Sequence, residues 1–276
     1  MKSIAVIMTV HNRREKTLRC LDCLYAQRVN SVAHSLTVYL TDDGCADGTK
    51  EAVTKRFPDI RIIDGDGTLF WNMGMRKAWE VAAEGGYDYY LWLNDDTYLY
   101  TNSLETLLSS SEMYDDKAII VGSTVSSDEK MITYGGWSDV GLISDVSKPH
   151  LCQTFNGNIV LVPEYVYGRL GLNTTIFRHR GGDTEYGMRA RKNGIDVWTA
   201  IGAQGICDSH PNIPLWKDPS VPFRKRWKNL MSPLGANPFE FFRFRKLYYG
   251  LFPACLSFFT NIIHVLFPSL KLWHRE

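Results

Sequence analysis

The sequence predicts an α/β fold in which a mostly parallel β-sheet is flanked by helices and followed by a helical tail. In the first half of the chain, short apolar runs alternate with segments of helical periodicity, which is the pattern of β–α–β units. The apolar runs are continuous, as expected for strands that are buried on both faces. The 276 residues, 45% of them hydrophobic, are enough to bury a large core.

The expected elements follow one another regularly in the first half of the chain. We expect strands at 3–10, 36–41, 60–63 and 89–93, with helices at 15–27, 49–57 and 72–84. The signals that follow are weaker, and they predict strands at 118–122, 131–134, 159–162 and 195–200, with helices at 163–170 and 183–192. Residues 1–212 are therefore assigned to one α/β domain, and 213–276 to a helical extension.

Acidic turns follow three of the predicted strands. Asp42 and Asp43 follow the second strand, Asp64 follows the third, and Asp95 and Asp96 follow the fourth. In a parallel sheet, ligands bind beyond the carboxyl ends of the strands, so these turns should share one edge. Each turn alone is compatible with a purely structural Asx turn. Three together would repel one another unless a cation or hydrogen-bond donors lay between them.

The pair Asp95 and Asp96 is suited to binding two different ligands. Adjacent side chains of an extended segment point in opposite directions, so one carboxylate can face a metal and the other a ribose or sugar hydroxyl. Oxygen ligands select Mg²⁺ or Mn²⁺, which commonly bridge carboxylates and diphosphates. Such a cation would neutralise a diphosphate leaving group.

Asp183 begins the predicted helix at 183–192 in the segment GGDTEYGMRARKNG. Aspartate is a preferred helix N-cap, and this structural role alone would explain the residue. The alternative role is that of a general base, which removes the proton from an attacking hydroxyl. The two preceding glycines would let an acceptor approach the backbone closely.

The order of the motifs TVHNR, TDDGCADGT, WLNDD, FNGNIVLVP and GGDTEYGMRARKNG resembles that of the family-2 glycosyltransferases with the GT-A fold. The resemblance covers about the first three quarters of the chain. It implies a metal-dependent, inverting transfer of a hexose from a nucleotide-diphosphate sugar to a hydroxyl of a glycan acceptor. A UDP-sugar is the favoured donor, and dTDP-rhamnose is possible.

The resemblance also implies roles for residues at the nucleotide. Thr9 and Asp42 or Asp43 would hold the nucleobase and ribose, and Asp64 would contact the nucleoside. Asn94 stands where many members carry aspartate, and this departure leaves the identity of the donor open.

Further roles concern the metal and the chemistry. Asp96 would be the ligand of Mn²⁺ or Mg²⁺, with Asp95 beside it in the donor site. Asp183 matches the catalytic base. His210, in the segment CDSHP, resembles a histidine that completes the metal site in some members, and a purely structural role is the alternative. Gly182 replaces the glutamate that often precedes the base.

A different class of enzyme has one motif in common with this chain. The segment IRIIDGDGTLF resembles the nucleophile motif of haloacid-dehalogenase-like phosphohydrolases, with Asp64 as nucleophile and Asp66 as acid. The spacing disfavours it, because that fold needs several strand–helix units between Asp66 and its later acidic motif. The nucleophile motif of that family also lies on the first strand, whereas this segment follows two complete strand–helix units. A dinucleotide-binding dehydrogenase is disfavoured because the first strand is followed by TVHNRRE and not by G-x-G-x-x-G.

The carboxyl-terminal extension differs in charge from the rest of the chain. Residues 213–276 contain ten Lys/Arg against three Asp/Glu, although the whole chain has a net charge of only +1. This near-neutral total argues against a nucleic-acid partner. The basic residues of the extension lie among aromatic ones in PFRKRW and FEFFRFRKL, a composition that suits a membrane interface. These residues are Arg224, Lys225, Arg226, Lys228, Arg243, Arg245 and Lys246. The alternative is a helical lid with a solvated basic face.

The apolar stretch 248–270 carries no Lys, Arg, Asp or Glu, but glycine and prolines interrupt it. We therefore expect it to lie on a membrane and not to cross it. The chain is expected to be cytoplasmic and peripheral on the inner face of the membrane. The acceptor would then be a lipid-linked glycan, such as a bacterial capsule or O-antigen.

Overall fold

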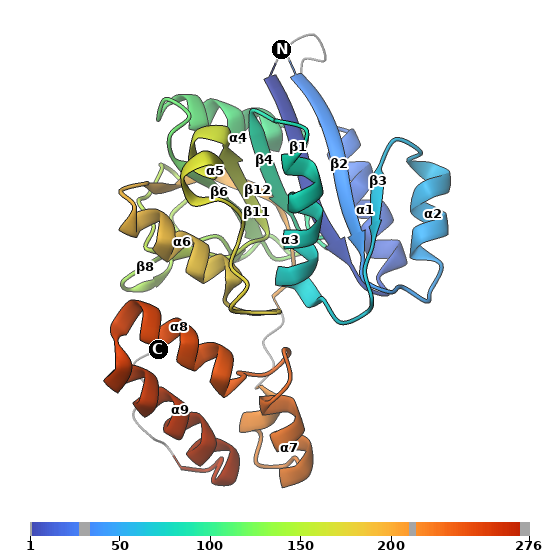
Figure 1. Ribbon diagram of the computed structural model, residues 1–276. Helices are drawn as coiled ribbons and strands as arrows, with labels where there is room; N and C mark the ends of the chain where they lie inside the picture. The colour runs from blue at the N-terminus through green and yellow to red at the C-terminus, as the bar shows by residue number, and fades with distance from the viewer. Residues whose placement is uncertain (1, 28–33, 210–213, 271–276) are drawn as a thin grey trace. The chain divides into compact units, whose positions relative to one another are not determined.

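The computed structural model describes residues 2–27, 34–209 and 214–270. The chain divides into two compact units. The first contains Met1–Thr174 and Asp183–Ser209, and the second contains Thr175–Gly182 and His210–Glu276. Figure 1 shows the strands and helices of both.

The first half of the chain alternates strands and helices as predicted, with ends shifted by a few residues. The elements up to α4 are β1 (Lys2–Val10), α1 (Arg14–Tyr25), β2 (His34–Asp42), α2 (Thr49–Arg56), β3 (Arg61–Asp64), α3 (Phe70–Ala83), β4 (Tyr89–Leu93), β5 (Tyr98–Leu99) and α4 (Ser103–Glu112). Those that follow are β6 (Ile119–Val125), β7 (Ile132–Tyr134), β8 (Gly136–Ser138), β9 (Gly141–Leu142), β10 (Thr154–Phe155), β11 (Ile159–Pro163), α5 (Glu164–Leu170), α6 (Gly182–Lys192) and β12 (Val197–Ile206). Helix α4 and the short strands β5 and β8–β10 were not predicted.

The main sheet brings the predicted acidic turns to one edge. Within the described residues its path is β3-β2-β1-β4-β11-β6-β12-β5, and the first four strands on this path are parallel. In the register of this sheet Val10 pairs with Asp42, and Asp42 pairs with Asp64. Strand β11 is antiparallel to both β4 and β6. The carboxyl ends of β1, β2, β3 and β4 therefore lie side by side, and the α/β prediction is confirmed.

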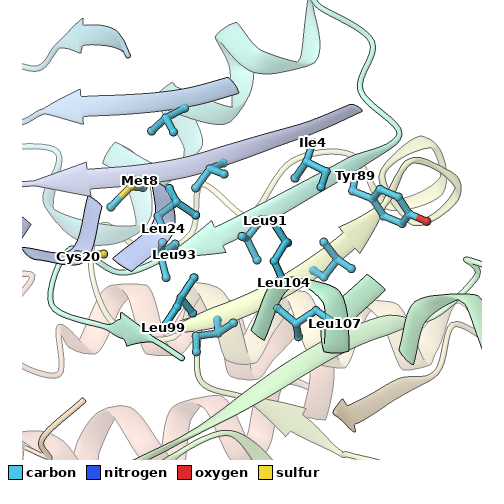
Figure 2. Packing of buried hydrophobic residues seen from close by; sticks show 14 of the residues in the cluster. Ile4, Met8, Cys20, Leu24, Tyr89, Leu91, Leu93, Leu99, Leu104 and Leu107 are labelled. Atoms are coloured by element: carbon cyan, nitrogen blue, oxygen red, sulfur yellow. The ribbon is translucent and has the colours of Figure 1, made fainter. Parts of the chain in front are cut away.

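Helices cover both faces of the sheet because its strands are apolar on both sides. In β1, Ile4, Val6 and Met8 pack with residues of α1, α2 and α4. Figure 2 shows this cluster, in which Leu24 of α1 and Leu107 of α4 lie with the strand residues. Ala5 and Ile7 point to the opposite face and pack with residues of α3, α5 and α6. The alternation explains why the strands appeared as continuous apolar runs.

The second unit is built from helices. These are the 3₁₀-helix η1 (Leu215–Lys217), α7 (Phe223–Leu230), α8 (Pro238–Tyr249) and α9 (Leu251–Leu266). Trp216, Leu230 and Val265 form its buried cluster. Between α8 and α9, Gly250 has a φ of 91°, a conformation that favours glycine. In the described part of the chain, no helix has the length and apolar character needed to cross a membrane.

Arg226 does not belong to the exposed basic surface that the sequence predicted. Its guanidinium is buried and donates from Nε and Nη2 to the carbonyl oxygen of Val265, at 3.2 and 3.1 Å. It therefore ties α7 to the last turn of α9, where unpaired helix carbonyls attract a cation. This tertiary role is not visible in the local segment PFRKRW.

Candidate functional site

Asp95 and Asp96 follow β4 in a turn and share a cationic partner, so the expectation that their side chains point in opposite directions is wrong. Nη1 of Arg13 lies 3.1 Å from Oδ1 of Asp95 and 2.8 Å from Oδ2 of Asp96. The two carboxylate side chains are only 8% and 10% exposed, whereas Arg13 is 43% exposed. Burial raises the pKa of Asp95 to about 7, and the adjacent Arg13 opposes this rise. No polar atom among the described residues forms a hydrogen bond with Oδ2 of Asp95.

The segment after β1 delivers Arg13 to this position. Arg13 is the N-cap residue of α1, and its carbonyl oxygen accepts hydrogen bonds from both N and Oγ1 of Thr17. Partial burial alone would lower the pKa of the guanidinium, but the two carboxylates raise it. The motif TVHNR predicts a role for Thr9 but gives no local sign of one for Arg13. The sequence does contain one sign of such a residue, because the neighbouring carboxylates Asp95 and Asp96 require a cation nearby.

Asp42 and Asp43 organise turns through their carboxylates. Asp42 accepts a hydrogen bond from the backbone N–H of Cys45 at 2.7 Å. Asp43 accepts three bonds from the segment after β3, which come from the N–H groups of Gly67, Leu69 and Phe70. Both aspartates therefore stabilise turns, as the structural alternative predicted.

Helix α3 begins at Phe70 in a strained backbone conformation. Phe70 has a φ of 58°, which is unusual for an aromatic residue. The hydrogen bond from its N–H to Oδ2 of Asp43, at 2.8 Å, helps to hold this conformation. Asp43 therefore fixes the path of the backbone that precedes Trp71, and such strain often occurs at functional sites.

Thr9 and Asp64 lie at the same edge in different environments. Thr9 is 8% exposed, and its hydroxyl donates to the carbonyl oxygen of Thr41 at 3.3 Å. Helix α3 approaches it closely, because a Cβ atom on Gly74 would lie 2.2 Å from Oγ1 of Thr9. Asp64, at the end of β3, has a side chain that is 73% exposed and forms an ion pair with Lys50.

Asp183 lies in the first turn of α6 and contacts the segment that precedes β11. Its Oδ2 accepts a hydrogen bond from the N–H of Gly157 at 3.0 Å, and Oδ1 accepts one from the N–H of Thr184 at 2.8 Å. The bond to Gly157 extends outside the helix, which a local capping role does not require. Burial raises the pKa of Asp183, while these N–H groups lower it in part.

Trp71 connects Asp183 to the acidic pair. Its Nε1 donates to Oδ1 of Asn94 at 2.6 Å, next to Asp95 in the chain. The other end of the ring covers Gly157, where an added Cβ would lie 2.5 Å from two ring atoms and 3.4 Å from Cβ of Asp183. The predicted base is therefore linked by direct contacts to Asn94, the residue that precedes the acidic pair in the chain. Sequence reasoning missed both Trp71 and Gly157.

The donor set is compatible with a divalent cation that is shared with a substrate. Among the described residues, no cluster of three or more His, Cys, Asp or Glu side chains is arranged to hold a metal. Mg²⁺ is usually held by one or two carboxylates together with water and substrate phosphates. Asp95 and Asp96 meet this requirement, and Oδ2 of Asp95 is a buried oxygen without a hydrogen-bond partner among the described residues. The predicted ligand His210 lies outside the described residues.

The phosphohydrolase alternative is not favoured by the structure. Asp64 and Asp66 follow the third strand in chain order, at the end of the sheet path, and not a central first strand. Oδ1 of Asp66 accepts bonds from both N and Oγ1 of Thr68, which is the pattern of an ordinary Asx turn.

Comparison with known proteins provides both a family and a fold. Residues 5–147, more than half of the chain, match the family described as Glycosyl transferase family 2. None of the curated proteins compared with the chain matches it.

Two solved structures share the fold at low sequence identity. One is a mannosyltransferase from Pyrobaculum calidifontis in complex with GDP-Man and Mn²⁺. It has 14% identity and a TM-score of 0.56, with 96% of this chain and 80% of that chain covered. The other is TarS from S. aureus, with 12% identity and a TM-score of 0.58. Here 98% of this chain is covered, but only 50% of TarS. These likenesses confirm the predicted GT-A fold.

Proposed function

The chain belongs to glycosyl transferase family 2, and on this basis we propose that it is an inverting enzyme that transfers a hexose from a nucleotide-diphosphate sugar to a glycan hydroxyl. The observation that carries the proposal is the contact path Asp183–Gly157–Trp71–Asn94, which joins a candidate base to the acidic pair. Release of a nucleoside diphosphate that depends on an acceptor hydroxyl tests this function. Phosphate release from simple esters in its place would contradict it.

The nucleotide end of the donor is assigned to the ends of β1, β2 and β3. Thr9 and Asp42 or Asp43 would face the nucleobase and ribose, and Asp64 would contact the nucleoside. Because Asp43 holds the segment before α3 through three N–H groups, its contribution would be to shape this pocket. UDP-sugars are the favoured donors, and dTDP-rhamnose is the alternative. The GDP-Man complex of the Pyrobaculum enzyme supports a nucleotide-sugar donor.

The diphosphate is assigned to the acidic pair. Asp96 would hold Mn²⁺ or Mg²⁺, His210 could complete the site, and Asp95 would contribute to the donor pocket. The Mn²⁺ in the Pyrobaculum complex supports a divalent ion. When bound, such an ion neutralises the charge that develops on the leaving diphosphate.

Asp183 is assigned the role of general base. Its N–H partners on Gly157 and Thr184 fix the carboxylate, and its raised pKa makes it a stronger proton acceptor than an exposed aspartate. The acceptor hydroxyl would give its proton to Asp183 while its oxygen forms a bond to the anomeric carbon. The bond from that carbon to the diphosphate oxygen breaks at the same time, so the configuration inverts.

We assign the acceptor to the lipid-linked glycans, because the second unit has features of a membrane-binding surface. Helix α9 exposes Phe252, Leu256, Phe259, Ile263 and Leu266, which are each between 38% and 79% exposed. Their spacing of four and three residues places them on one face of the helix. We call this set the α9 stripe. An apolar face of this kind is typical of helices that lie in a membrane interface.

Basic and aromatic side chains accompany the α9 stripe in the same unit. The exposed basic residues of helices α7 and α8 are Arg224, Lys225, Lys228, Arg243 and Lys246. Phe223 and Trp227 are also exposed, by 45% and 36%. Each basic residue near an anionic leaflet contributes about 1 kcal/mol. The proposed location is therefore the cytoplasmic face of the membrane, where polysaccharide precursors such as those of capsule or O-antigen are assembled.

The full chain should co-sediment with anionic vesicles at low salt and be partly released by high salt, because salt screens charge but not insertion. Replacing Leu256 and Phe259 together by glutamine should lower the bound fraction severalfold. Val140→Gln is the matched control, since Val140 is 98% exposed but lies in the first unit. Equal binding of the double variant and the control would rule out the α9 stripe. If the full chain does not bind at all, the lipid-linked acceptor loses its support.

A further inference from the structure

Arg13 occupies the position between the two carboxylates that a divalent cation would need. A single nitrogen, Nη1, contacts Oδ1 of Asp95 and Oδ2 of Asp96. A divalent cation held by Asp96 would meet the positive charge of the guanidinium close by, and like charges repel strongly in a partly buried site. The metal and the guanidinium therefore cannot both occupy the space between the two aspartates.

The backbone of Arg13 is held independently of its guanidinium. Its backbone is fixed by the two hydrogen bonds from Thr17 to its carbonyl oxygen, whereas its side chain is 43% exposed. Rotation about side-chain bonds is thus sufficient to move the guanidinium. The two carboxylates are almost fully buried, so a cation that replaces the guanidinium would be stabilised beside them.

We propose that Arg13 is a built-in counter-cation of the acidic pair, which the divalent metal displaces and which then binds the diphosphate of the donor. A guanidinium forms two parallel hydrogen bonds with phosphate oxygens, so a diphosphate brought in with the metal is a suitable new partner. The metal without diphosphate has to displace Arg13 with no compensating contact. Metal and diphosphate consequently bind cooperatively. The inference rests on the proposed function, because it assumes a donor diphosphate at this site.

The displacement is tested by measuring how tightly the full chain binds Mn²⁺ alone. The electron paramagnetic resonance signal of free Mn²⁺ measures this binding. Arg13→Gln removes the competing charge and should tighten Mn²⁺ binding on the order of tenfold. Arg13→Lys retains a cation and should bind Mn²⁺ as weakly as the unaltered chain. Arg14→Gln is the matched control, because the Arg14 side chain pairs with Glu15 at 3.5 Å and not with the acidic pair.

A second titration tests the transfer of Arg13 to the diphosphate. Its probe is inorganic pyrophosphate, which is common to all candidate donors, in saturating Mn²⁺. Arg13→Gln should weaken pyrophosphate binding on the order of tenfold, and Arg14→Gln should not. Mn²⁺ affinity that is unchanged or lower in Arg13→Gln overturns the counter-cation role, and unchanged pyrophosphate affinity overturns the transfer. If the unaltered chain binds no nucleoside diphosphate with Mn²⁺, the proposed function itself fails, and this result is distinct from the other two.

Discussion

Replacement of Asp183 by asparagine is expected to lower the rate of sugar transfer by about 10²–10⁴-fold. Asparagine cannot accept the proton of the acceptor hydroxyl. It retains one oxygen for the N–H of Gly157 or Thr184, so the loss of stability should be only about 1 kcal/mol. Donor affinity should not change. Steady-state kinetics and a thermal melt of the same preparation measure the two effects.

The matched control on the same helix is Glu185→Gln. Glu185 is 3% exposed and pairs with Arg189 at 3.1 Å, so its replacement should cost stability but little turnover. Near-normal turnover of Asp183→Asn would refute the base assignment. The pH profile gives an independent readout. Because burial raises the pKa of Asp183 and only the ionised form accepts a proton, activity should be present above that pKa and lost as pH falls through it. This loss should set in above the ordinary value of about 3.9.

Removal of divalent metal is expected to abolish transfer, and addition of Mn²⁺ or Mg²⁺ should restore it. Asp96→Asn should reduce the rate by about 10²-fold or more while the chain stays folded, because the leaving diphosphate loses its electrostatic partner. Asp66→Asn is the control, since Asp66 only closes a turn with Thr68 here but would be the acid in a phosphohydrolase. Full activity in excess chelator would contradict the metal assignment, and loss of activity in Asp66→Asn would revive the phosphohydrolase.

The sequence predicted the acidic edge because its signals are local. Continuous apolar runs mark the parallel strands, and a residue at the end of such a strand lies at the carboxyl edge whatever the details of packing. For this reason the sequence alone predicts that Asp42, Asp64 and Asp95 lie at the same edge. The strand register confirms the placement of the first two.

Contacts between distant loops were not predictable in the same way. Arg13 meets Asp95 across 82 residues of sequence, and Trp71 meets Asn94 across 23. The indole and guanidinium carry no periodic pattern that reveals their partners. Arg226 was misassigned for the same reason, because its partner Val265 lies 39 residues away.

Short strands also escaped prediction. The strands β8, β9 and β10 contain only two or three residues each, too few for an alternating pattern to be recognised. Strand β12 extends beyond the predicted end at residue 200, through register shifts near Gly205. Glycine weakens a strand signal, although here it allows close approach to Tyr98.

The central claim is that the carboxyl edge of the sheet binds a nucleoside diphosphate together with a divalent metal. The most direct test is the melting temperature of the chain in UDP, dTDP, GDP or CDP, each with and without Mn²⁺, because a ligand at 100 times its Kd stabilises the fold by about 2.7 kcal/mol. We predict that UDP or dTDP raises the melting temperature in the presence of Mn²⁺, and that Asp96→Asn removes this shift. If no nucleotide has an effect, or if the shift is the same without metal and in Asp96→Asn, the claim is contradicted.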